Sequence, residues 1–504
     1  MSLENLFKPL RLLALPVLLV TGGTADPAFD RKLSTDLRPE HALNRLAFGA
    51  RPGEVERVRK LGLNRWIDEQ LHPERLAVNP LLAERLAPLQ TINLTPAQLA
   101  EQYPLRTAAK KGKKKDIEPS AKRPGRPGAI VGADLVEAKI YRALYSDRQL
   151  EEVLVDFWFN HFNVYLNKGP ERLMVTSYER DAIRPYVLGR FEDMLLATAK
   201  HPAMLYYLDN WQSVDPKAME AITRRRAGGK QLAKRARGLN ENYARELMEL
   251  HTLGVDGGYT QRDVVEVARC FTGWTLRNPR QGASYFFAPM LHDQTEKTVL
   301  GHRIAAGHGE EDGLAVINIL ARHPATARFI SRKLAQRFVA DQPPQALVDR
   351  MTATFTKTQG DLREVMKTMI ASPEFFSEGA YRSKLKSPFE MVVSAARALN
   401  ADVTNAKPLS ARIDELGQPL YRKEEPTGYY NTADEWTNTA GLVGRMNVAN
   451  ALAANQLPGS KVDATRYAPP AALRADIDKR LEGRAPTPEL IAGLAIGSPE
   501  FQRR

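Results

Sequence analysis

The chain has 504 residues, of which 43% are hydrophobic and 26% charged, and its formal net charge is +13. This is the composition of a globular protein, and it excludes a mostly disordered chain, a collagen-like chain and a membrane protein with many spans. Since domains usually hold ~100–200 residues, the length predicts two or three packed units, and the positive charge raises the question of an acidic partner.

The N-terminus has the order of a secretory signal peptide. Lys8 and Arg11 precede an apolar run at residues 12–20, and small residues follow up to Ala25. The run is too short to span a bilayer, which needs ~20 apolar residues. We therefore expect residues 1–25 to be a signal peptide and the protein to be periplasmic or secreted, the alternative being a buried N-terminal helix.

Residues 26–103 alternate short helical patterns with tight turns, and we expect them to form an N-terminal helical unit. Leu43 and Leu46 share one apolar stripe, and Gly49 can end this helix because glycine adopts the left-handed conformation without a Cβ clash. His41 lies at the start of the same helix, where we expect it to be exposed.

Residues 104–129 break the helical pattern and are expected to form a basic flexible linker. Nine Lys or Arg and two acidic residues lie at 106–126, and seven Lys or Arg with no acidic residue lie at 224–237, so these two segments hold the whole charge excess. Neither carries an aromatic residue on which a base could stack, which argues against sequence-specific nucleic-acid binding. They are either solvated loops or loops that dock on an anionic polymer, an acidic partner or a membrane surface.

A central helical unit is expected at residues 130–405 and a C-terminal helical unit at 406–504. Apolar residues recur at helical spacing at 135–145, 150–162, 183–199, 240–253, 261–271, 329–338, 346–355, 362–371 and 388–399. The β-prone segments 285–287 and 298–300 predict one small hairpin near 285–304. The expected fold is therefore all-α or mainly α and multi-helical, with two or three packed helical units and one small β-hairpin.

One segment carries a family resemblance. Residues 240–260 read NENYARELMELHTLGVDGGYT, and this pattern resembles the signature of a bacterial family, domain of unknown function 1800 (DUF1800). Segments 41–49, 157–162, 271–274, 292–293 and 372–375 agree with the same family. The resemblance covers nearly the whole chain after residue 25. It implies an exported, mainly helical protein, often encoded beside a second exported family, DUF1501, and it supplies no reaction and no cofactor.

The signature segment predicts one polar helix face. Asn242, Glu246 and Glu249 fall at i, i+4 and i+7, so they project from the same side. Carboxylates three residues apart, joined by a histidine from another helix, are typical of di-metal bundles, although those bundles use Glu-x-x-His where this chain has Glu-x-x-Glu. The alternative is ion pairing of the two carboxylates, with Arg245 and Arg269 as partners.

Two histidines are candidates to complete that site. His161 follows Asn160 in an aromatic run, where a neutral imidazole could act as a general base or metal ligand or could be a satisfied core histidine. His292 and Asp293 lie in the predicted turn between the β-prone segments, where they are open to chemistry or to a purely conformational role. The hypothetical catalytic set is thus Glu246, Glu249, His161 and His292, and the hypothetical metal set is Glu246, Glu249 and His161.

A loop before the last helical patterns holds Tyr429 and Trp436 among Asn and Thr residues. Exposed aromatic side chains there could stack on sugar rings or on a partner protein, or they could fill a seam between units. The candidate binding residues are Asn242, Arg245, Asn160, Asp293, Trp436 and Tyr429.

Three hypotheses for function follow from the sequence. The first is an exported protein that binds a partner protein or polymer, with a DUF1501-type protein as a candidate partner. The second is an exported enzyme, metal-dependent or not, with a cleft around the 240–253 helix. The third is an envelope scaffold whose basic loops hold anionic lipid. No motif assigns a reaction, a substrate or a cofactor.

Overall fold

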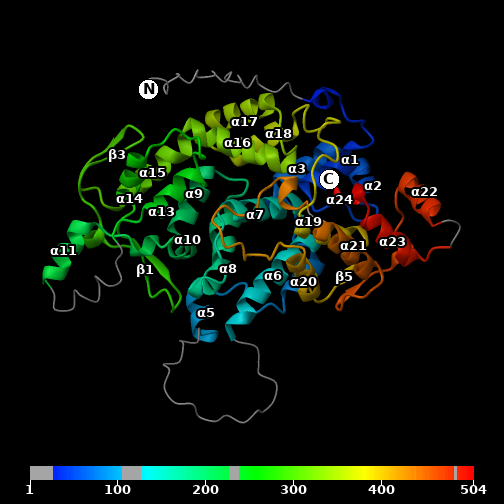
Figure 1. Ribbon diagram of the computed structural model, residues 1–504, viewed down its shortest axis with the longest axis horizontal. Coiled ribbons are helices and arrows are strands. Elements are labelled where there is room, and N and C mark those ends of the chain that lie inside the picture. The colour runs from blue at the N-terminus through cyan, green and yellow to red at the C-terminus, as the bar shows by residue number, and fades with distance from the viewer. Residues whose placement is uncertain (1–25, 105–126, 226–237, 438, 482–484) are drawn as a thin grey trace, which may run out of the picture.

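The structure, a computed structural model, describes residues 26–104, 127–225, 238–437, 439–481 and 485–504 (Figure 1). The expected signal peptide and nearly all of the two basic segments lie outside these residues. The fold is mainly helical, as predicted, with small sheets of two strands each.

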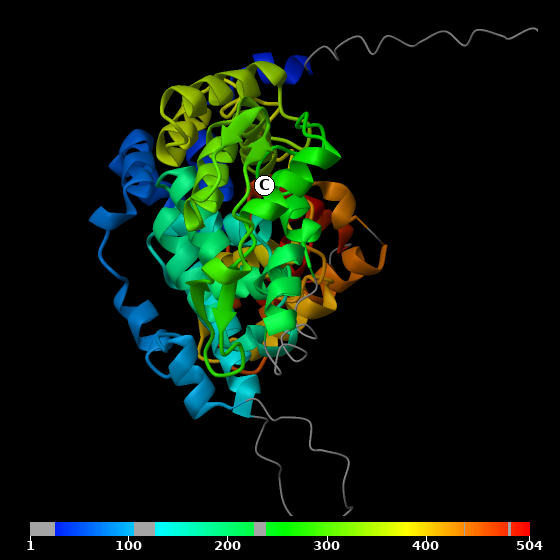
Figure 2. The ribbon, with the colours of Figure 1, turned by 90° about the vertical axis from the view of Figure 1, so that its left-hand side faces the viewer.

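The N-terminal helices form a row along one edge of the molecule, in blue in Figure 2. They contact the central helices α6 and α7, since α1 and α3 pack on α7 and α4 packs on α6. The row consists of α1 (Arg38–Leu46), α2 (Glu54–Leu61), α3 (Leu63–Leu71), α4 (Pro80–Leu86) and α5 (Pro96–Gln102).

Helices α6 and α7 cross the middle of the molecule, and the helices that follow them in the sequence pack around them. The central group comprises α6 (Pro127–Tyr145), α7 (Gln149–His161), α8 (Val175–Ser177), α9 (Phe191–Lys200), α10 (Pro202–Tyr207), α11 (Pro216–Arg225), α13 (Glu241–Glu249) and α14 (Gln261–Cys270). Helix α15 (Glu310–Arg322) packs on α9 and α14. A layer at the top of Figure 1 comprises α16 (Pro324–Phe338), α17 (Gln345–Lys357) and α18 (Leu362–Ile370).

The remaining helices pack at the opposite end of the long axis from α11. They are α19 (Pro388–Ala398), α20 (Lys407–Glu415), α21 (Thr439–Ala453), α22 (Ala471–Arg480), α23 (Pro488–Ile496) and α24 (Pro499–Gln502). A π-helical segment occupies Tyr178–Ile183, and single 3-10 turns lie at Pro27–Asp30, Pro73–Arg75, Gly169–Leu173, Arg184–Tyr186, Asn210–Gln212, Pro289–Leu291, Ala433–Glu435 and Ala464–Arg466.

Many helices begin with the same local device, a capping side chain followed by proline. Asn79, Thr95 and Ser387 each accept a hydrogen bond from a backbone amide of the first turn, and the next residue is a proline. The cap satisfies an amide that has no partner inside the helix, and proline removes another. The positions at which these helices begin are therefore determined by the local sequence.

The predicted hairpin is the main correction to the expected fold. Both β-prone segments are strands, but each pairs with a different neighbour. Strand β2 (Ser284–Phe287) pairs with β1 (Trp274–Arg277), and β3 (Lys297–Val299) pairs with β4 (His302–Ile304), both antiparallel. The loops that join β1 to β2 and β3 to β4 are shorter than the loop that would join β2 to β3 in the predicted hairpin. A third pair joins β5 (Asp402–Val403) and β6 (Ser460–Lys461).

A single helix predicted at 183–199 is also broken. The chain forms a 3-10 turn at Arg184–Tyr186 and reaches α9 only at Phe191. The break falls at residues 187–190, where Gly189 has a low helix propensity and the backbone of residues 189–191 pairs with that of residues 360–362. The apolar spacing of the sequence continues through the break, which explains the longer prediction.

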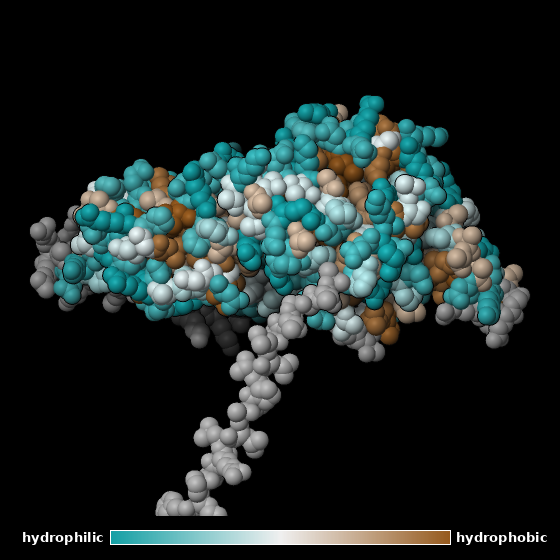
Figure 3. Space-filling model, turned by 90° about the horizontal axis from the view of Figure 1, so that it is seen from above, coloured by the Kyte–Doolittle hydropathy of each residue, from teal (hydrophilic) through white to brown (hydrophobic). Residues whose placement is uncertain are grey.

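One cluster of buried apolar side chains runs through all three expected units. It includes Leu43 in α1, Trp158 in α7 and Leu452 in α21, each fully or almost fully buried. The outer face in Figure 3 is mainly hydrophilic, with apolar patches that are denser toward one end. Within the described residues, the search for a helix with the length and hydropathy of a membrane span finds none.

A buried carboxyl lies within this packed interior. Glu171 is in the turn Gly169–Leu173, which contacts α5, α6, α8 and α10. The side chain is fully buried, and neither carboxyl oxygen has a hydrogen-bond partner among the described residues. Burial raises the pKa of Glu171 well above its ordinary value, although Lys168 opposes the rise. Burial thus favours the neutral carboxylic acid of Glu171 over its carboxylate.

We expect Glu171→Gln to raise the melting temperature at pH 7.5 by about 2–5 °C and to change it little at pH 4. The pKa of Glu171 is raised in the folded state, so ionisation stabilises the unfolded chain increasingly as pH rises above ~4.3. Glutamine cannot ionise and removes this effect. Thermal unfolding at both pH values is the measurement, with the exposed Glu56→Gln as control. A variant that is less stable than the wild type at pH 7.5 would contradict the prediction.

Candidate functional site

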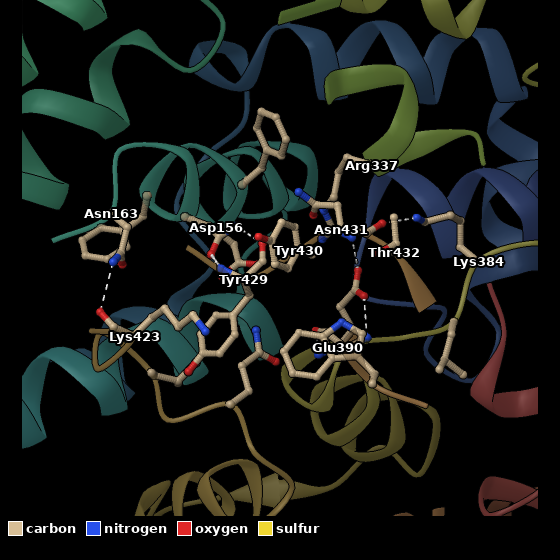
Figure 4. Close-up of a pocket in the computed structure, with 18 of the residues that line it drawn as sticks. Asp156, Asn163, Arg337, Lys384, Glu390, Lys423, Tyr429, Tyr430, Asn431 and Thr432 are labelled. Atoms are coloured by element: carbon tan, nitrogen blue, oxygen red, sulfur yellow. Dashed lines mark hydrogen bonds and ion pairs between the residues drawn. The ribbon is translucent and has the colours of Figure 1, made fainter. Parts of the chain in front are cut away.

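A polar pocket lies beside α7, near the middle of the molecule (Figure 4). Its cavity volume is about 60 Å³, and the space free of protein atoms reaches about 720 Å³ only when the mouth that is open to solvent is included. The lining residues are Lys139 of α6, Asp156, Phe157, Phe159 and Asn160 of α7, Asn163, Arg337 of α16, four residues at 384–390, nine residues at 418–436, and Arg504. Elements that are far apart in the sequence thus meet at one cavity.

One side of the pocket is formed by residues 419–436, here called the cover loop. Asn160 at the end of α7 binds this loop twice, because its amide nitrogen donates to the Tyr429 carbonyl at 2.8 Å and its amide oxygen accepts from the Tyr429 nitrogen at 2.7 Å. Gly428 makes this approach possible. It has a φ of +66°, and a Cβ at this position would lie 2.2 Å from the Asn160 carbonyl oxygen.

Two further contacts hold the cover loop at its ends. The Asn163 amide nitrogen donates to the carbonyls of Lys423 and Glu425, at 3.0 and 2.9 Å. At the other end, Asp341 accepts from the Ala433 nitrogen at 2.8 Å, and the Lys384 ammonium donates to both Asp341 and the Asn431 carbonyl. The loop is therefore fixed by buried and partly buried side chains from three separate parts of the chain, although it contains little regular structure.

The cover loop gives the pocket an aromatic wall. The rings of Tyr429 and Trp436 pack with their centroids 5.4 Å apart, and the Lys423 ammonium lies 5.1 Å from the centre of the Tyr429 ring. Trp436 is almost buried, whereas Tyr430 is 62% exposed. The wall thus presents one free aromatic ring to solvent beside two packed ones.

Glu390 is the carboxylate around which the positive side chains of the pocket are arranged. It lies in the first turn of α19 and accepts from the Ser387 nitrogen at 2.9 Å, so it caps its own helix. Its Oε1 pairs with Arg337 and lies 3.2 Å from Nε of Arg504. Burial would raise the pKa of Glu390, but the two guanidinium groups outweigh burial and hold the pKa at about 2.

Three more buried cations lie near Glu390 and its two arginines, and none of the three is paired with a carboxylate of a described residue. Arg45, Lys386 and Arg445 are at most 4% exposed, and none of them takes part in an ion pair between described residues. Arg445 donates to the Lys386 carbonyl at 2.8 Å, and the Lys386 ammonium lies 3.7 Å from the centre of the Phe501 ring. Burial lowers the pKa of Lys386 to about 7. The region behind the pocket thus carries a surplus of buried positive charge.

Lys139 and Asp156 form a neutral pair on the α6 and α7 side. Their Nζ and Oδ1 atoms are 2.9 Å apart. The same ammonium lies 5.1 Å from the centre of the Tyr421 ring and 5.5 Å from that of Phe389. Because Asp156 compensates Lys139, this pair does not add to the surplus.

The predicted face of the signature helix α13 lies elsewhere. Asn242 is exposed, Glu246 is partly buried, and Glu249 accepts a hydrogen bond from the Tyr259 hydroxyl at 2.8 Å. Burial raises the pKa of Glu246, and the nearby charge of Glu249 raises it further. Arg245 donates to Gln261 at 2.8 Å instead of pairing with either glutamate.

His161 is enclosed in the core and faces another histidine. It is 2% exposed, its Nε2 lies 3.1 Å from the His251 carbonyl oxygen, and its ring packs edge-on against Trp158 and Phe162. Burial lowers the pKa of His161 well below its ordinary value, so the ring is neutral. Of the two roles open from the sequence, these contacts fit the core histidine.

His292 and Asp293 are neighbours with separate partners. His292 Nε2 lies 3.0 Å from Asp312 Oδ2, and Lys297 Nζ lies 2.6 Å from the same oxygen, with all three side chains buried. Asp293 pairs with Arg269 at 2.7 Å. Burial would raise the pKa of Asp293, but hydrogen bonds from Arg269 outweigh it and hold the pKa at about 2. These contacts hold the segment between β2 and β3 against α14 and α15.

The structure does not bring the hypothetical catalytic and metal residues together. Among the described residues, no group of three or more His, Cys, Asp or Glu side chains could hold a metal ion. Glu246 and Glu249 also form no ion pair with Arg245 or Arg269, since Arg269 pairs with Glu266 and Asp293.

His41 corrects another expectation. It is 1% exposed, and its Nε2 lies 2.8 Å from the Phe375 carbonyl oxygen, because the turn at 372–377 covers the start of α1. The sequence around α1 carries no sign of that distant segment.

Of the residues named from the sequence, Asn160, Tyr429 and Trp436 do meet at the pocket. None of the seven charged residues of its lining was predicted from the sequence; they are Lys139, Asp156, Arg337, Lys384, Glu390, Lys423 and Arg504. The only local signal was the Ser387-Pro388 start of a helix with Glu390 in its first turn, and that pattern indicates a cap and says nothing of distant arginines.

Comparison with known families agrees with the resemblance of residues 240–260. A family model described as "Protein of unknown function (DUF1800)" matches residues 41–503. The chain belongs to the DUF1800 family. The DUF1800 match spans all of the pocket elements except Arg504. Searches for similar curated proteins and for similar solved structures find no match to this DUF1800 protein.

We expect Asn160→Ala to lower the free energy of unfolding by about 1–3 kcal/mol, because the substitution leaves the buried backbone of Tyr429 without its two partners. Urea denaturation measures this change, and hydrogen exchange at 419–436 should rise in the variant. The exposed Asn167, for which no side-chain hydrogen bond is found among the described residues, provides the control Asn167→Ala, expected within ~0.5 kcal/mol of the wild type. Equal effects of the two variants would show that Asn160 does not anchor the cover loop.

Proposed function

We propose that this DUF1800 protein is an exported binding protein whose pocket holds the acidic group of its ligand. The observation that carries the proposal is the charge of the pocket. Its lining contains five Lys or Arg side chains, Lys139, Arg337, Lys384, Lys423 and Arg504, and two carboxylates, Asp156 and Glu390.

The energetics of the buried cations support an anionic ligand. A buried charge without a partner costs several kcal/mol, and such groups are normally paired or neutralised. Arg45, Lys386 and Arg445 are close enough to Glu390 for their charges to interact. However, Glu390 already pairs with Arg337 and Arg504, and the nearby Asp341 already pairs with Lys384. An anion in the pocket would offset part of this surplus.

Arg337 has the geometry to receive such a group. Its side-chain hydrogen bond to a described residue uses Nη1, which donates to Glu390, so Nη2 and Nε are available. A planar guanidinium binds a carboxylate or phosphate through two parallel hydrogen bonds. Lys384 is 3% exposed and is held by Asp341 at the same side of the cavity in Figure 4, where it adds positive charge.

The other elements of the proposal come from the sequence. Export is supported by the composition of residues 1–25, and the basic segments 106–126 and 224–237 would attract the same acidic ligand over a longer range. An acidic polymer or acidic protein of the envelope fits these charges, and a DUF1501-type protein stays a candidate partner. The enzyme hypothesis around 240–253 has less support, because its four candidate side chains do not form one site.

Thermal unfolding of the full chain at constant ionic strength tests the proposal, with citrate and inorganic phosphate as probes and sodium chloride as reference. A ligand that binds only the folded state at 100 times its Kd stabilises it by about 2.7 kcal/mol, so we expect the melting temperature to rise by about 2–5 °C. The rise should be lost in Arg337→Gln and reduced in Lys423→Gln. It should persist in Lys367→Gln, whose side chain is 64% exposed on α18.

Two outcomes would overturn the proposal. One is the absence of a rise with either probe, and the other is an equal rise in all variants, which would place the anion outside the pocket. Lys423→Gln keeps the test decisive if Arg337→Gln does not fold, because the Lys423 side chain is partly exposed at the rim.

A further inference from the structure

The pocket combines its cations with groups that suit a second kind of chemistry. Beside Arg337 and Lys384, the wall formed by the cover loop presents Tyr429, Tyr430 and Trp436 together with Asn431 and Thr432. Aromatic faces pack against the apolar face of a ring, and amide and hydroxyl side chains bind hydroxyl groups. The wall thus fits a ligand that has both a ring face and hydroxyl groups.

Several of these side chains form no hydrogen bond or ring contact with another described residue. No side-chain hydrogen bond to a described residue is found for Asn431 or Thr432, since Asn431 is held through its backbone carbonyl by Lys384. The Tyr430 ring packs on no other aromatic ring among the described residues, and Tyr430 is 62% exposed. An aromatic ring left in water beside a fixed pocket is an available stacking surface.

The helix beside the pocket disfavours a bare phosphate as the preferred group. Helix N-termini are good phosphate sites because of their free amides and dipole. The first turn of α19 reaches the pocket through Ser387, but Glu390 of the same helix already accepts the Ser387 amide at 2.9 Å. The donors left for a ligand are therefore side chains, with the Arg337 guanidinium best matched to a planar carboxylate.

Size limits the ligand further. The enclosed part of the cavity is about 60 Å³, well below the ~300–1,000 Å³ of typical small-molecule pockets. It therefore takes a single small group such as a carboxylate, and the rest of the ligand lies in the open mouth of the pocket beside Tyr430.

We propose that the ligand is a carboxylated sugar, free or at the end of an acidic polysaccharide, with its carboxylate at Arg337 and Lys384 and its ring against Tyr430. This inference rests on the proposed anion-binding function and specifies its ligand. The Asn431 and Thr432 side chains then bind the sugar hydroxyls.

Isothermal titration of the full chain with a trimer of galacturonic acid tests the inference, with the neutral galactose trimer, inorganic phosphate and AMP as comparison probes. We expect the acidic trimer to bind at least 10-fold more tightly than the neutral trimer, since only the former has a carboxylate. Tyr430→Ala should weaken the acidic trimer by about 3- to 10-fold. Tyr430→Phe should keep the affinity of the wild type, and neither variant should alter the thermal shift with phosphate.

The outcomes separate the two proposals. If phosphate or citrate stabilises the protein through Arg337 but the acidic trimer binds no better than the neutral one, the sugar inference fails and anion binding stands. Binding of AMP more tightly than of the trimer, or an unchanged trimer affinity in Tyr430→Ala, would also overturn the sugar inference. If no anion binds, both proposals fail.

Discussion

The ion pairs of Glu390 are the interaction on which the pocket region depends. One carboxylate at the start of α19 meets Arg337 from α16 and Arg504 from the C-terminal segment, and it caps its own helix as well. Three segments far apart in the sequence are thereby joined at one buried point. Removing one partner of such a group leaves an uncompensated buried charge, which is strongly destabilising. Arg45, Lys386 and Arg445, which are buried nearby, form no ion pair with a described carboxylate, so the region behind the pocket has an excess of positive charge.

Helices could be predicted from the sequence where local chemistry determines them. The capped start at Ser387 with Pro388, and the apolar spacing within α7 and α14, are local signals. The family resemblance was confirmed over residues 41–503. Strand segments could also be recognised, but their partners could not, because pairing depends on how the chain turns back between them. The break before α9 shows another limit, because the apolar pattern continues through residues 187–190 while the backbone of residues 189–191 pairs with the distant residues 360–362.

The site was harder to predict than the fold for the same physical reason. Asn160 and Tyr429 were recognisable as polar and aromatic residues in unusual surroundings, and the structure joins them through two hydrogen bonds. By contrast, the partners of Glu390 lie 53 and 114 positions away, and no periodicity connects residues over such separations. Glu246 and Glu249 shared a helix face as expected from spacing, yet a shared face does not supply the third ligand that a metal site requires.

The two lysines of the pocket region make its charge variable under ordinary conditions. Burial lowers the pKa of Lys384 to about 8, with Arg504 adding to the decrease and Asp341 opposing it, and it lowers the pKa of Lys386 to about 7. Alkaline solution therefore removes the positive charge of these two lysines, while a bound anion favours their protonated ammonium groups. Occupancy and proton uptake are then linked, so a ligand arriving at neutral pH would draw hydrogen ions from the medium.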